Sequence, residues 1–174
     1  MDIKALMNQL SKSSVNGNNK YGTAFDDAER CAEKGLPFPC RIIIRKGAII
    51  DSLGFAYDGF TLTHGGKGGS EQTFTLRKDE YIIKVKGTYE AFGKDVVISS
   101  LEFTTNMGNV FSANRPTNHS QSFEYKAENG YAISALHGRA GSYLGAIGFY
   151  ARKIDMDLGN NLKGFGNPFA SMGK

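Results

Sequence analysis

Three stretches of similar pattern decide the fold: IDSLGFAY (50–57), ISSLEFTT (98–105) and LGAIGFYA (144–151). When they are aligned, an apolar anchor falls at Leu53, Leu101 and Ile147, and a phenylalanine follows two positions later each time. The anchors are 48 and 46 residues apart, which is enough sequence for about four strands per unit. One such unit cannot bury its apolar face alone, so the sequence predicts three pseudo-symmetric units around a shared core.

The sequence after residue 20 is typical of short strands joined by tight turns. Runs rich in Ile, Val, Phe, Tyr and Thr alternate with Gly, Asn, Asp and Lys, and the chain has 22 Gly against 4 Pro. Its 174 residues fit one domain. We therefore expect an all-β domain of about ten to twelve strands over residues 21–153, with no helix of any length inside it.

The two ends of the chain differ from this pattern. A short helix, capped by Asp2, is predicted to present an apolar face made of Ile3, Leu6, Met7 and Leu10. This face either packs on its own domain or joins copies of the chain into a homo-oligomer, and only two Lys on the polar face argue against a membrane-surface helix. Residues 1–20 are expected to be a helical extension that ends in a polar linker, and residues 154–174 a Gly/Asn-rich tail.

Composition and charge exclude several classes of protein. The net charge is +4 with the basic residues scattered, whereas a nucleic-acid-binding surface needs them clustered. No run approaches 18 apolar residues, so membrane insertion is not expected, and the absence of a visible signal peptide predicts a cytoplasmic protein or one exported without a leader. The three His are far apart, so neither a metal nor another cofactor is expected. Cys31 and Cys40 either close a small loop or remain free thiols.

Two motifs in the first repeat stand out. Gly47 precedes Asp51 by four residues at the start of a predicted strand, and the double-glycine loop HGGKGGS follows at 64–70. With the threefold pattern, these segments resemble the jacalin-related lectins. The resemblance covers about residues 21–153 and implies a β-prism of three four-stranded Greek-key sheets, preceded here by the short N-terminal helix. It also implies a Gly-x-x-x-Asp loop that binds a monosaccharide with help from the glycine-rich loop.

Carried onto this sequence, the resemblance assigns a role to each residue of the site. The Asp51 carboxylate would hold two sugar hydroxyls, the amides of Ile49, Ile50 and Asp51 would donate to the sugar, and the amide of Gly65 or Gly66 would reach a further hydroxyl. An ionised Asp accepts two hydroxyl donors at once, and such charge-assisted bonds are strong. Glycine is needed where the backbone must approach a ligand closely.

The other two repeats depart from the family pattern. In the third repeat the segment GSYLG (141–145) places Gly145 at the aspartate position, and its partner loop NGNNKYG (16–22) lacks a double glycine. In the second repeat DVVIS (95–99) has Ser99 at that position, and SANRPTN (112–118) again lacks the glycine pair. Only the first-repeat site is therefore expected to be complete.

The favoured interpretation is a lectin for glycans or glycoproteins of the mannose/glucose type. Galactose-binding members of the family use a cleaved chain with a free N-terminal Gly, and nothing here resembles that processing. The alternative is a β-prism that no longer binds sugar and serves as a protein-interaction or targeting module. An enzyme is not expected, because no nucleophile elbow is present and the adjacent carboxylates Asp26 and Asp27 lie in a polar loop without a partner motif.

Overall fold

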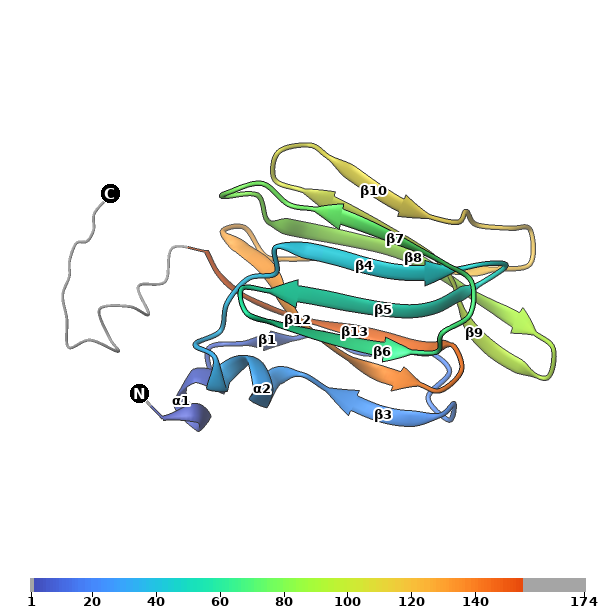
Figure 1. Cartoon of the computed structure of the whole chain (residues 1–174), viewed down its shortest axis with the longest axis horizontal. Helices are drawn as coiled ribbons and strands as arrows, with labels where there is room; N and C mark the ends of the chain where they lie inside the picture. Colours follow the sequence, from blue (N-terminus) through green and yellow to red (C-terminus); the bar gives the residue numbers. More distant parts are fainter. Residues whose placement is uncertain (1, 155–174) are drawn as a thin grey trace.

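The computed structural model describes residues 2–154, and the predicted tail lies outside them from residue 155 onward. Three antiparallel sheets surround one core (Figure 1). The first sheet has the order β6-β5-β4-β7. Its strands are β4 Arg41–Lys46, β5 Ile50–Tyr57, β6 Phe60–Gly65 and β7 Ser70–Thr75. This order is a Greek key, in which the last strand returns to lie beside the first.

The second sheet repeats that topology in the order β10-β9-β8-β11. Its strands are β8 Ile82–Phe92, β9 Asp95–Thr105, β10 Val110–Ala113 and β11 Gln121–Lys126. The third sheet is built around β12 Tyr131–Ala140 and β13 Leu144–Lys153, with β3 Thr23–Asp26 on the free edge of β12. The three sheets confirm the predicted all-β fold with threefold pseudosymmetry.

The fourth strand of the third sheet is divided into two short pieces. These are β1 Ser11–Lys12 and β2 Asn16–Gly17, and both pair with β13 along the same edge. The interpretation of residues 1–20 as a helical extension and linker is therefore wrong for 11–12 and 16–17, because their backbone completes a sheet of the domain. Two-residue strands show no alternation of side chains, which is why the sequence pattern does not reveal them.

The aligned anchors of the three repeats form the core. Leu53, Leu101 and Ile147 are at most 1% exposed, and so are the phenylalanines that follow them at 55, 103 and 149. Each repeat therefore contributes equivalent residues to the same core, which confirms the prediction that three units share one core.

Two short helices lie at the start of the chain. α1 (Ile3–Met7) is capped by the Asp2 side chain, which accepts a hydrogen bond from the Ala5 amide at 2.7 Å. Its apolar face packs on its own domain, with Leu6 in the core and the neighbouring apolar residues against it. This outcome matches the first of the two alternatives for that face. No helix among residues 2–154 is long and apolar enough to cross a membrane.

The second helix, α2 (Ala28–Glu33), was not expected from the sequence. It follows β3 and buries Ala28, Cys31 and Ala32, which lie one helical turn apart. The expectation of no helix inside the domain is therefore wrong. Three small or weakly apolar residues in six give little periodicity. Cys31 and Cys40 are both free thiols.

The three hairpin turns β4–β5, β8–β9 and β12–β13 lie at the same end of the prism, on the right in Figure 1. Each turn contacts a loop of another repeat. The Asn114 amide group donates to the Gly47 carbonyl at 3.1 Å, and that of Asn18 donates to the Val96 carbonyl at 3.2 Å. The Gly66 backbone lies against the carbonyl of Ser142. The contacts join the three repeats into a closed ring at this end.

Candidate functional site

The candidate site is centred on Asp51, the second residue of β5. The residue is only 6% exposed, although it is an acid. Within residues 2–154, no other residue donates a hydrogen bond to its carboxylate or pairs with it as an ion. Carboxylates that are this buried normally have such a partner. The site thus holds an acceptor whose hydrogen-bonding capacity the surrounding protein leaves largely unused.

A glycine-rich loop closes over the carboxylate. A Cβ placed on Gly68 would lie 2.6 Å from Oδ2 of Asp51, and one on Gly69 would lie 2.7 Å from Oδ1. Gly69 also has a φ of 69°, which disfavours any side chain. The close approach of backbone to carboxylate therefore requires glycine at both positions.

Backbone donors surround the same space. Among the described residues, the N–H groups of Ile49, Gly68 and Gly69 donate to no protein acceptor. A ligand that brings hydroxyl groups would find an ionised acceptor next to free amide donors. That combination suits a polyol, because each hydroxyl both donates and accepts.

Arg45 holds the loop and influences the acid. Its Nε donates to the Gly68 carbonyl at 3.0 Å and its Nη2 donates to the Gly69 carbonyl at 2.9 Å. Burial raises the pKa of Asp51, while the Arg45 cation and the residue's own amide act in the opposite direction. The carboxylate is thus costly to desolvate and gains from ligand donors.

The structure brings the six predicted residues together but assigns them different tasks. The side chains of Ile49 and Ile50 are buried, so only their backbone can face a ligand. The amide of Gly66 already donates to the carbonyl of Asp51 at 2.9 Å, and Gly65 packs directly on the Asp51 backbone. These two glycines therefore contact the backbone of Asp51, whereas Gly68 and Gly69 lie nearest its carboxylate.

Sequence reasoning placed Gly68 and Gly69 in the glycine-rich loop of the site but assigned contacts only to Gly65 and Gly66, and it did not single out Arg45. The signal for the glycines was present, since HGGKGGS contains two glycine pairs. A basic residue two positions before Gly47 is too common a feature to be recognised without the fold.

Gly47 and His64 also have definite places. The amide of Gly47 donates to the carbonyl of Ile49 at 3.0 Å, which closes the turn. His64 contacts the Asp27 carboxylate through Nε2 at 2.8 Å and stacks on Phe25 with ring centroids 3.6 Å apart. Its side chain therefore joins β6 to the start of α2, and its role is structural.

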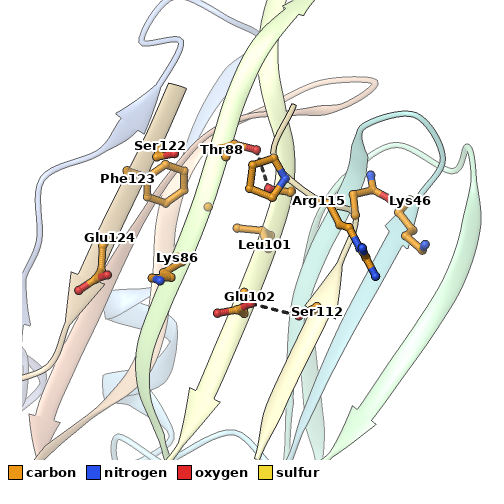
Figure 2. A pocket seen from close by; sticks show the side chains of 14 residues that line it. Lys46, Lys86, Thr88, Leu101, Glu102, Ser112, Arg115, Ser122, Phe123 and Glu124 are labelled. Atoms are coloured by element: carbon orange, nitrogen blue, oxygen red, sulfur yellow. Dashed lines mark hydrogen bonds between the residues drawn. The ribbon is translucent and has the colours of Figure 1, made fainter. Parts of the chain in front are cut away.

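A groove of about 950 Å³ lies on the second sheet, next to the first-repeat turn (Figure 2). Its floor includes the buried hydroxyls of Thr88 and Ser100, which are hydrogen-bonded to each other at 2.5 Å. Its rim carries charges of both signs, from Lys46, Lys86, Glu102, Arg115 and Glu124. Within residues 2–154 none of these five forms an ion pair.

Three antiparallel sheets around one core, with a nearly buried carboxylate under a glycine loop at one end, define a β-prism domain with a candidate ligand site. The Jacalin-like lectin domain model matches residues 14–150. The chain therefore belongs to the family of jacalin-like lectins.

Individual relatives agree with this assignment. Horcolin from Hordeum vulgare is 33% identical over 124 residues, which are 66% of this chain and 84% of that protein. A mannose/glucose-specific lectin from Parkia pendula is 35% identical over 141 residues, which are 75% of this chain but only 30% of that protein. The structure of a mannose-binding jacalin-related lectin from Ananas comosus is 32% identical with a TM-score of 0.69, covering 83% of this chain and 99% of that one.

Proposed function

We propose that this protein is a non-enzymatic lectin that binds one hexose of the mannose/glucose type at the first repeat. The observation that carries the proposal is the Asp51 carboxylate, which is nearly buried beneath a glycine loop and accepts no hydrogen bond from another residue within 2–154. Two neighbouring hydroxyls of the sugar would donate to its two oxygens. The free amides of Ile49 and Gly68 would donate to further oxygens of the ring.

The sugar type rests on the relatives together with the chemistry of the site. The Parkia pendula lectin is described as mannose/glucose-specific and the Ananas comosus lectin as mannose-binding. A site of one carboxylate and a few amides holds a monosaccharide weakly, so useful avidity on a glycoprotein would come from several copies of the chain acting together.

The test is a calorimetric titration of wild type and Asp51→Ala with methyl α-mannoside, with methyl α-galactoside as the control sugar. We expect weak binding of the mannoside by wild type, none by the variant, and none of the galactoside by either. A wild-type chain that binds neither sugar would overturn the proposal.

A second candidate function is supported by the groove of Figure 2. Its unpaired charges of both signs suit a protein partner with complementary charges, and this function would leave Asp51 without a role. It predicts that Lys86→Glu weakens partner binding while Asp51→Ala has no effect. The lectin function predicts that Asp51→Ala abolishes sugar binding and that Lys86→Glu leaves it unchanged.

A further inference from the structure

The third repeat retains the backbone frame of the candidate sugar site. In the first repeat, Arg45 donates from Nε and Nη2 to the carbonyls of residues 68 and 69, at 3.0 and 2.9 Å. In the third, Arg139 donates from Nε and Nη2 to the carbonyls of residues 21 and 22, at 2.7 and 2.8 Å. The loop at 21–22 therefore corresponds to the glycine loop at 68–69.

Two further backbone hydrogen bonds match between the repeats. In each five-residue turn the first residue donates to the carbonyl of the third at 3.0 Å, and the carbonyl of the fifth accepts from the facing loop at 2.9 Å. The pairs are Gly47 to Ile49 and Gly66 to Asp51 in the first repeat, and Gly141 to Tyr143 and Asn18 to Gly145 in the third. Position 145 thus corresponds to Asp51, and position 143 to Ile49.

The side chains at corresponding positions are exchanged. In the first repeat Asp51 lies beneath a glycine, Gly68. In the third repeat Tyr21 takes the place of Gly68, and the position opposite it is Gly145. A Cβ on Gly145 would lie 2.6 Å from the Cβ of Tyr21 and against its ring, and one on Gly141 would lie 3.3 Å from Cε2. In each repeat one side chain occupies this space. In the first repeat it is Asp51 of the turn, and in the third repeat it is Tyr21 of the facing loop.

Tyr21 also satisfies a backbone donor of the turn. Its hydroxyl oxygen accepts a hydrogen bond from the Tyr143 amide at 3.2 Å. The corresponding amide in the first repeat, that of Ile49, has no protein acceptor among the described residues. The rings of Tyr21 and Tyr143 stack with centroids 6.5 Å apart, and Phe92 packs edge-on against Tyr143 at 5.4 Å. The phenol is thus held in place by its neighbours.

We propose that Tyr21 is a built-in occupant of the third-repeat site. Its ring fills the space that the carboxylate uses in the first repeat, and its hydroxyl supplies the oxygen that a sugar would offer to the turn. The third repeat is therefore a latent hexose site that the chain itself keeps closed, and Tyr21 together with Gly145 sets the number of sugars bound per chain. The identity of the hexose rests on the function proposed above.

The test places the residue types of the first repeat at the corresponding positions of the third repeat. Tyr21→Gly together with Gly145→Asp reproduces the first-repeat arrangement, and we expect the number of methyl α-mannoside molecules bound per chain to rise from one to two. The same pair placed in an Asp51→Ala background isolates the third repeat and is expected to bind one. This arm tests the closed site even if the wild-type chain binds no mannoside.

Matched single variants complete the experiment. Tyr21→Gly alone opens the space but supplies no carboxylate, so no second site is expected. A folded Asp51→Ala/Tyr21→Gly/Gly145→Asp chain that binds no mannoside would overturn the proposal. If that chain does not fold, amide hydrogen exchange in Tyr21→Phe decides. Loss of the hydroxyl should speed exchange at Tyr143 by roughly ten-fold, the value of one ordinary hydrogen bond, and unchanged exchange would overturn the proposal.

Discussion

Replacing Gly68 with alanine separates the role of the glycine loop in binding from its role in folding. The new Cβ would lie 2.6 Å from Oδ2 of Asp51, about 0.8 Å closer than ordinary contact allows. The backbone of Gly68 lies outside the left-handed region, so the chain accepts alanine there. The carboxylate is the flexible end of its side chain and can rotate away from the new methyl group. We therefore expect the free energy of unfolding to fall by less than about 1 kcal/mol.

Binding should respond much more strongly. A carboxylate displaced by this amount loses at least one hydrogen bond to the sugar, and bonds to charged groups contribute about 1.5–3 kcal/mol each. The affinity for methyl α-mannoside should therefore fall by roughly ten- to hundred-fold. Calorimetric titration measures the affinity, and thermal denaturation of the same samples measures the stability.

Gly69→Ala is the matched control. Its φ of 69° disfavours alanine, and the new Cβ would strike the carbonyl of Lys46, which cannot rotate away. We expect the free energy of unfolding to fall by about 2–4 kcal/mol. Each kcal/mol corresponds to roughly 2–4 °C in melting temperature for a domain of this size. If Gly68→Ala stays folded and binds the mannoside as tightly as wild type, the glycine loop does not face the sugar and the site is wrongly placed.

Two further predictions concern stability and thiol reactivity. Burial lowers the pKa of His137 below 6.5, so the unfolded chain takes up a proton before the folded chain does as the pH falls. Denaturation at pH 7.5 and 5.5 should therefore show a lower free energy of unfolding at the acid pH. A His137→Gln variant with the same pH dependence would contradict this assignment. Cys31 is fully buried and burial raises its pKa to about 11, whereas Cys40 is exposed. Iodoacetamide should therefore label the native protein once, at Cys40. Two adducts, or none, in the mass spectrum would be the contrary result.

The parts of the fold that could be predicted from sequence are those with a repeated apolar signal. Leu53, Leu101 and Ile147 occupy corresponding places in one core, and buried positions of this kind constrain the residue type strongly. The elements that were missed carry no such signal. The strand at 16–17 is defined by backbone pairing to β13, and α2 is too short to show a helical period.

The candidate site was predictable in its acid and in its glycine loop as a whole, because both depend on local sequence. Which glycine pair approaches the carboxylate depends on how the loop folds back over β5, and sequence spacing does not determine this. The family resemblance paired the loop at 16–22 with the turn at 141–145, but it gave no sign that the Tyr21 ring packs on Gly145, because that contact depends on how one side chain is oriented in the folded domain.

The ring of contacts at one end of the prism has a consequence for how such a chain can change over time. The turn of the first repeat is held by Asn114, a residue of the second repeat, whose own turn has Ser99 at the position that corresponds to Asp51. A repeat that lacks this aspartate therefore still supports the turn of its neighbour. Under the proposed function, binding sites can be deleted or restored one at a time by exchanging one or two side chains, while the number of repeats stays fixed at three. Selection can thus adjust the valency of the domain without rebuilding its architecture.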